Sequence, residues 1–156
     1  MKYYIAYGSN LSVAQMAFRC PNARVVGRAV LNNWKLVFRK HATIERKRGS
    51  TVPVLIWAID DEDERSLDRY EGFPKYYIKD YLPVDVTFKD GEQKRIKAMV
   101  YIMVYPRPII PPTWDYYSII KSGYKRFQFD VNILKQACRE AYFESYPAYA
   151  TTYKAR

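Results

Sequence analysis

The fold of this chain is decided by a five-residue stretch near its start, Tyr7-Gly8-Ser9-Asn10-Leu11. The preceding residues 2–6 form a short aromatic and aliphatic run that is typical of a buried strand. The following Ser12 can cap a helix, in which apolar residues recur at helical spacing until Pro21. The stretch therefore links the end of a strand to the start of a helix.

Such a junction supports two interpretations. The plainer one is an ordinary strand-to-helix turn, which the five residues alone favour. The other is an anion-binding site, because Gly8 allows the backbone to approach a ligand and unpaired N–H groups at a helix start point toward it. A second element, around Glu71, is needed to choose between them.

Length and composition indicate one domain over residues 1–156, with a loosely ordered tail at 146–156. The chain is 49% hydrophobic and 27% charged, a balance typical of a protein with its own core. Its two cysteines, Cys20 and Cys138, have no metal-binding spacing, which favours reduced thiols and a cytoplasmic location. The longest apolar run has the length of a strand, so we expect neither a signal peptide nor a membrane partner.

The positive charge of the chain has three possible uses. Lys and Arg outnumber Asp and Glu by 26 to 16, a formal net charge of +10. The basic residues are spread along the chain, densest at 39–40 and 46–48, and no nucleic-acid-binding motif accompanies them. We therefore interpret them as a solvated basic face rather than a nucleic-acid interface. Attraction of an anionic substrate is the third use.

Hydrophobic patterns predict several strands after the first. They are expected at residues 22–38, 43–45, 52–59, 76–88 and 96–104. Bends at Gly27 and at 32–33 make the first of these a curved strand or a hairpin pair, and a basic turn is expected at 46–50. The segment 52–59 is apolar almost throughout, which predicts burial on both faces.

Helices are expected between and after these strands. The acidic run at 60–64 is interpreted as a helix start rather than a metal site, because carboxylates favour the positive end of the helix dipole. That helix should end at Gly72, a second should end near Gly123, and Asp130 can cap the last one. The mixture of antiparallel hairpins and helices predicts an α+β fold around a curved sheet or barrel.

Glu71 is the candidate base. It stands at a helix end between the bulky residues Tyr70 and Phe73, where burial would raise its pKa toward neutrality. Two alternatives remain, namely a lowering of the pKa by Arg69 or Lys75, and a plain solvent-exposed glutamate.

Other chemistries fit the sequence less well. A Ser-His-Asp triad would need His41, the one histidine, but Ser9 lacks the Gly-x-Ser-x-Gly turn that such a nucleophile requires. His and Cys ligands for a metal are too few, and the glycine patterns of nucleotide-binding loops are absent.

Taken together, these residues resemble the γ-glutamylcyclotransferase-like superfamily, which includes AIG2-like proteins and γ-glutamylamine cyclotransferases. The stretch 7–11 is similar to the family's Tyr-Gly-Ser-Asn-Leu substrate loop. Residues 67–72 are similar to its Leu-Asp-x-x-Glu-Gly segment, in which the glutamate is catalytic, and this implies Glu71. Tyr77 and Tyr116 are similar to aromatic residues that face the family's cavity. The fold implied is a mixed β-barrel or strongly curved sheet flanked by helices.

The resemblance also implies a reaction. The α-amine of a γ-glutamyl amine, peptide or related adduct would attack its own γ-carbonyl, releasing 5-oxoproline and an amine. Glu71 would act as general acid and base, and the N–H groups from Gly8 to Leu11 would hold the α-carboxylate or polarise the carbonyl. Tyr77 and Tyr116 would shape the cavity, and no metal or organic cofactor is required. The alternative is a non-enzymatic module of the same fold that binds an anionic metabolite or nucleic acid.

Overall fold

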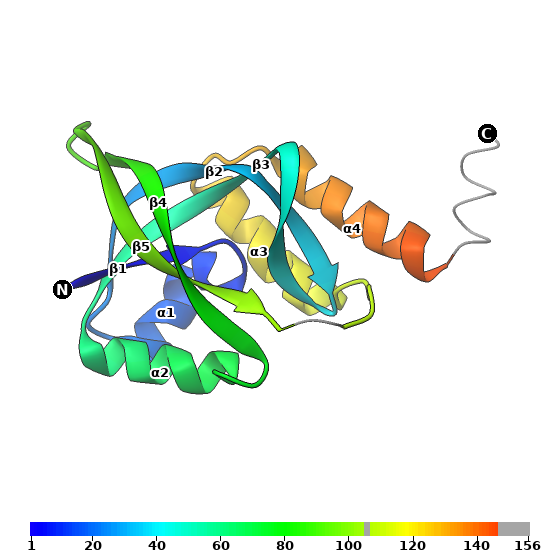
Figure 1. Ribbon diagram of the computed structural model, residues 1–156, viewed down its shortest axis with the longest axis horizontal. Coiled ribbons are helices and arrows are strands. Elements are labelled where there is room, and N and C mark those ends of the chain that lie inside the picture. The colour runs from blue at the N-terminus through cyan, green and yellow to red at the C-terminus, as the bar shows by residue number, and fades with distance from the viewer. Residues whose placement is uncertain (105–106, 147–156) are drawn as a thin grey trace.

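In a computed structural model of the chain, which describes residues 1–104 and 107–146, five strands close into a barrel (Figure 1). They are β1 (Lys2–Ala6), β2 (Arg24–Arg39), β3 (His41–Ile59), β4 (Tyr77–Phe88) and β5 (Gln93–Met103). The strands follow the order β1-β3-β2-β4-β5, and β1 closes the barrel by pairing antiparallel with β3 and parallel with β5. The barrel is therefore mixed, and the expected α+β class is confirmed.

Helices flank this barrel. They are η1 (Ser9–Leu11, a 3-10 turn), α1 (Val13–Arg19), α2 (Asp61–Glu71), α3 (Trp114–Arg126) and α4 (Val131–Ser145). In Figure 1, α1 and α2 lie together on one side, whereas α3 and α4 cover another side, where α4 contacts β2. None of the helices in this described part is long and apolar enough to cross a membrane. Apart from residue 146, the tail expected at 146–156 lies outside the described residues.

The long β2–β3 hairpin corrects one expectation. Its turn lies at Lys40, and register shifts near Gly27 and Asn33 bend β2, so the curved-strand interpretation holds. The basic turn expected at 46–50 is wrong, because β3 runs without interruption from 41 to 59. Its early part is held by pairing with β2, a contact that local sequence does not reveal.

Helix α2 ends as its sequence predicts and is tied to the barrel by charge. Asp60 caps it in a capping box with Asp63, and Gly72 closes it in the left-handed conformation at φ 64°. On the barrel side, Lys79 Nζ lies 2.6 Å from Glu64 and 2.9 Å from Asp68. These ion pairs set the orientation of the helix whose last residue is Glu71.

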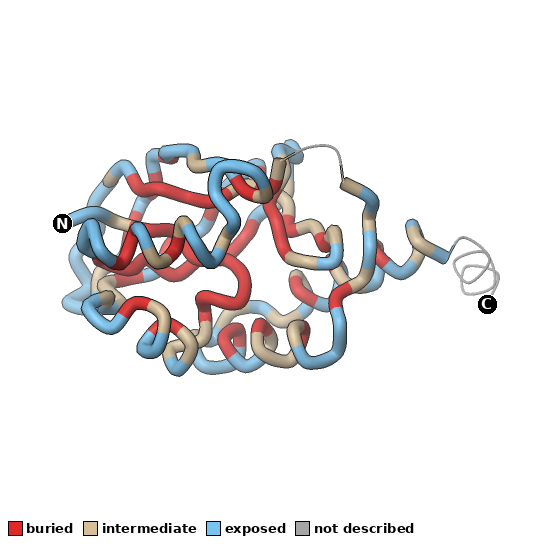
Figure 2. Tube along the Cα trace, turned by 90° about the horizontal axis from the view of Figure 1, so that it is seen from below, coloured by how far each residue is buried: buried red, intermediate tan, exposed pale blue. Residues whose placement is uncertain are grey.

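The other helices differ from expectation in two places. Ser12 caps α1 by accepting from the Gln15 N–H, as predicted, but Phe18, one of the apolar residues that recur at helical spacing in this helix, is 92% exposed. Helix α3 does not end at Gly123 but passes through it to Arg126. Gly123 serves a close crossing inside the helix instead of ending it, since a Cβ there would lie 2.5 Å from the Leu11 Cβ. Buried residues thus continue from the barrel interior into the strand-to-helix junction (Figure 2).

Candidate active site

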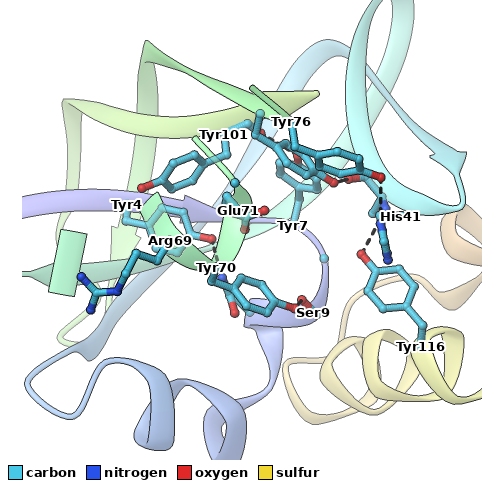
Figure 3. Close-up of a pocket in the computed structure, with 15 residues that line it drawn as sticks. Tyr4, Tyr7, Ser9, His41, Arg69, Tyr70, Glu71, Tyr76, Tyr101 and Tyr116 are labelled. Atoms are coloured by element: carbon cyan, nitrogen blue, oxygen red, sulfur yellow. Dashed lines mark hydrogen bonds between the residues drawn. The ribbon is translucent and has the colours of Figure 1, made fainter. Parts of the chain in front are cut away.

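A cavity of about 340 Å³ lies between the junction at residues 7–10, the end of α2 and the start of β3 (Figure 3). Its walls are formed by Tyr4, Tyr7, Gly8, Ser9, Asn10, His41, Ala42, Arg69, Tyr70, Glu71, Gly72, Tyr76, Tyr77, Tyr101 and Tyr116. The structure therefore places seven of the eight residues predicted for the site around one cavity, although they come from distant parts of the chain.

Leu11 is the exception and corrects the predicted substrate loop. It does not line the cavity, and its side chain is completely buried beneath α3. Its backbone N–H donates to the Gly8 carbonyl at 3.0 Å, so this group is used to close the 3-10 turn. Leu11 holds the loop in place from behind instead of contacting a ligand.

The rest of the junction presents backbone donors at the cavity wall. Within the described residues, no acceptor is recorded for the N–H groups of Gly8, Ser9 and Asn10. A Cβ at position 8 would lie 3.3 Å from the Cβ of Ala42, a tight contact, so glycine lets the loop lie close to β3. The Asn10 carbonyl accepts from the Trp57 indole at 3.1 Å, which fixes the loop against the barrel. A fixed loop with free N–H groups is suited to an anion or a polarised carbonyl.

Glu71 contributes its carboxylate from the end of α2. The residue is half-buried. Among the described residues, no hydrogen bond or ion pair to this carboxylate is recorded. Burial raises the pKa of Glu71 to about 7, and the positive charge of Arg19 opposes that rise. The counter-charge is thus neither Arg69 nor Lys75, the two candidates from the sequence. Arg19 comes from α1, and its guanidinium lies 3.3 Å from the centre of the Tyr70 ring.

The tyrosines of the cavity are neutral donors and acceptors. Burial raises the pKa of Tyr7, Tyr77 and Tyr116 well above the ordinary value, so none ionises near pH 7. The backbone N–H and the backbone carbonyl of Ala42 each form a hydrogen bond with a tyrosine. Its carbonyl accepts from the Tyr77 hydroxyl at 2.6 Å, and its N–H donates to the Tyr116 hydroxyl oxygen at 3.0 Å.

Several lining residues were missed by the sequence analysis. His41 was considered only for a Ser-His-Asp triad, yet its Nδ1 lies 2.9 Å from the Tyr76 hydroxyl and its ring contacts Tyr116. Burial lowers the pKa of His41, which keeps the ring neutral. Tyr4 and Tyr101 carry no motif of their own. Only the closure of the barrel brings these side chains to the site.

The arrangement can move a proton without a metal. Glu71 is the one carboxylate among the described lining residues, and the described residues contain no cluster of His, Cys, Asp and Glu suited to a metal ion. A carboxyl group with a pKa near 7 exchanges protons readily at neutral pH. Free backbone N–H groups and neutral hydroxyls nearby can hold the polar groups of a small molecule.

Several known proteins are similar to most of this chain. The family model described as "Gamma-glutamyl cyclotransferase, AIG2-like" matches residues 4–123. Gamma-glutamylcyclotransferase of Bos taurus is 31% identical, over 78% of this chain and 69% of the relative, and that of Homo sapiens is 30% identical over the same shares. A solved structure described as "Gamma-glutamyl cyclotransferase" superposes with a TM-score of 0.71 at 28% identity, covering 87% of this chain and 85% of its own.

Proposed function

The chain belongs to the γ-glutamyl cyclotransferase, AIG2-like family and is a cyclotransferase, and from this premise we propose its substrate and its base. The substrate is a γ-glutamyl amine, peptide or related adduct. The products are 5-oxoproline and the free amine, and Glu71 is the general acid and base. The residues that bind the substrate are Tyr7, Gly8, Ser9, Asn10, Tyr77 and Tyr116.

The proposed reaction begins with a proton transfer. The ionised carboxylate of Glu71 takes a proton from the substrate's α-ammonium group, and the resulting amine attacks the γ-carbonyl carbon. The C–N bond to the leaving group then breaks as Glu71 returns the proton to the leaving nitrogen. A second proton leaves the new ring nitrogen, so that two of the three α-ammonium protons end on the released amine.

One observation carries this proposal, which is that Glu71 and the loop of residues 8–10 face the same cavity. Because nucleophile and electrophile belong to one molecule, the protein mainly has to hold that molecule folded. The loop N–H groups serve the α-carboxylate or the carbonyl oxygen, and a pKa of about 7 lets Glu71 act in both directions. The cytoplasmic location predicted from the sequence belongs to the same proposal.

The test is release of 5-oxoproline from a panel of γ-glutamyl amino acids and γ-glutamyl alkylamines, with the wild type beside Glu71→Gln. We expect the wild type to turn over at least one class and Glu71→Gln to lose roughly a thousandfold in kcat. No release from any member of the panel would contradict the substrate class. Substantial turnover by Glu71→Gln would contradict its role as the base.

A stability measurement shows whether Glu71→Gln is folded. The folded-state pKa of Glu71 lies above its ordinary value of 4.5, so the stability that the group contributes at low pH is lost as pH rises through about 7. Glutamine stays neutral and avoids this loss. At pH 8 we therefore expect the variant to unfold with a free energy roughly 2–3 kcal/mol greater than the wild type.

A further inference from the structure

The tyrosine hydroxyls of the cavity differ in the direction of their hydrogen bonds. A phenolic hydroxyl has one proton to donate and can also accept. Tyr7 donates to the carbonyl of residue 101, Tyr77 to the carbonyl of Ala42, and Tyr101 to the Asp68 carboxylate, each at 2.6 Å. The protons of these three hydroxyls are therefore held by the protein and are not available to a ligand.

The hydrogen bond of Tyr116 to the protein runs in the opposite direction. Its oxygen accepts the backbone N–H of Ala42 at 3.0 Å, and a backbone N–H can only donate. The hydroxyl proton of Tyr116 must therefore point elsewhere, and no described residue is recorded as accepting it. The Ala42 carbonyl thus takes up the proton of the Tyr77 hydroxyl, whereas the Ala42 N–H leaves the hydroxyl proton of Tyr116 free to donate to a ligand.

The free proton of Tyr116 lies beside the loop donors. A Cβ on Gly8 would lie 3.6 Å from the Tyr116 hydroxyl oxygen, so this hydroxyl lies beside the first residue of the loop 8–10, whose N–H groups have no acceptor in the described structure. In Figure 3, Tyr116 extends from α3 with its hydroxyl at the cavity wall near His41. A hydroxyl proton and free backbone donors therefore meet on one side of the cavity.

We propose that Tyr116 donates a hydrogen bond to the γ-carbonyl oxygen as that oxygen becomes negatively charged during ring closure. The proton stays on the tyrosine throughout, and the interaction is stronger in the transition state than in the bound substrate. This role rests on the proposed cyclotransferase reaction and gives it an oxyanion donor. Tyr116 would then not only shape the cavity but also stabilise the negative charge that develops on the γ-carbonyl oxygen.

Tyr4 is the other tyrosine that accepts from an unambiguous donor, the Asn10 side-chain amide at 2.9 Å. Figure 3 shows its hydroxyl on the Glu71 side of the cavity, where the Asn10 amide holds it. Of the two hydroxyls, only that of Tyr116 lies within 4 Å of a Cβ placed on Gly8, at the start of the loop. Tyr116 is therefore the hydroxyl assigned to the oxyanion.

The test compares Tyr116→Phe with Tyr124→Phe in the 5-oxoproline assay. Tyr124 is a matched control on the same helix, because its hydroxyl is buried without a partner in the described structure and lies outside the cavity. We expect Tyr116→Phe to lower kcat roughly 100- to 1000-fold with little change in KM, as for loss of one oxyanion donor. We expect Tyr124→Phe to keep the wild-type kcat.

A second measurement separates charge stabilisation from a structural effect, because Tyr116→Phe also leaves the Ala42 N–H without its acceptor. Inhibition by the product 5-oxoproline reports binding of a molecule whose ring-amide carbonyl carries no negative charge. We therefore expect its inhibition constant to change less than about fivefold in Tyr116→Phe. A kcat within about fivefold of wild type would overturn the proposal, and so would a rise in the inhibition constant as large as the fall in kcat.

The failure of this proposal is distinguishable from failure of the proposed function. If the wild type is active and Glu71→Gln is not, the reaction stands, and the Tyr116→Phe result alone decides the role of Tyr116. If the wild type releases no 5-oxoproline from any substrate, both proposals are overturned.

Discussion

At the scale of single residues, the charge balance of the cavity depends on Glu71 and on Arg19, which no sequence motif connects. Burial favours the neutral carboxyl group, whereas the nearby guanidinium favours the charged one. The guanidinium is held in place by stacking on Tyr70 and by donating to the side-chain oxygen of Asn10. Arg19 is therefore expected to tune the base without contacting the reacting atoms.

The pH profile tests this balance. A base must be ionised to act, so kcat/KM should fall as pH drops through about 7 in the wild type. Arg19→Gln removes the charge that lowers the pKa of Glu71, and we expect the acidic limb to move to higher pH. Arg65→Gln, an exposed position on α2, should leave the limb in place. A limb near pH 4.5, or one that Arg19→Gln does not move, would contradict this account.

At the scale of elements, the crossing of α3 over η1 connects two parts of the site. Leu11 lies under Gly123, α3 carries Tyr116, and the neighbouring loop carries the free N–H groups. The absence of a side chain at position 123 allows the two elements to approach. The distance between Tyr116 and the loop therefore depends on a residue that does not touch the cavity.

Gly123→Ala is expected to force these elements apart. Its Cβ would lie 2.5 Å from the Leu11 Cβ, and overpacking of this kind costs about 1–3 kcal/mol. Denaturant unfolding should show this loss, and kcat should fall because Tyr116 and the loop shift. Ser122→Ala, on the exposed side of the same helix, is the control. Equal unfolding free energies for the two variants would refute the crossing argument.

At the scale of the whole molecule, barrel closure joins the first strand to the last. β1 pairs with both β3 and β5, so residues far apart in the chain share one buried core. We propose that residues 1–156 form a single domain, as the length of the chain predicts. In calorimetry we expect one unfolding transition whose calorimetric and van't Hoff enthalpies agree. Two separate transitions would contradict a single domain.

Charge is also distributed unevenly over the whole molecule. Much of the negative charge belongs to α2 and its cap, at residues 60–64, 68 and 71. The rest of the chain is strongly basic, and its interpretation as a solvated face stays a prediction, as does the separate use of this charge to attract an anionic substrate.

The sequence by itself determined the capping of the helices and the family to which the chain belongs. Helix ends follow from capping groups within a few residues, as at Ser12, Asp60, Gly72 and Asp130, so they could be predicted closely. The loop at 7–11 and the segment 67–72, which contains Glu71, pointed to the family because each is a short contiguous motif.

Only the tertiary structure decided which other groups reach the cavity and how they are used. His41 and Tyr4 line the cavity, Arg19 acts on Glu71 by its charge, and Leu11 lies outside the cavity, all through contacts between segments far apart in sequence. The free proton of Tyr116 depends on an N–H from β3, a strand that local patterns divided at residues 46–50. Such features require distant backbones to pair, and hydrophobic periodicity along one segment carries no information about its partner.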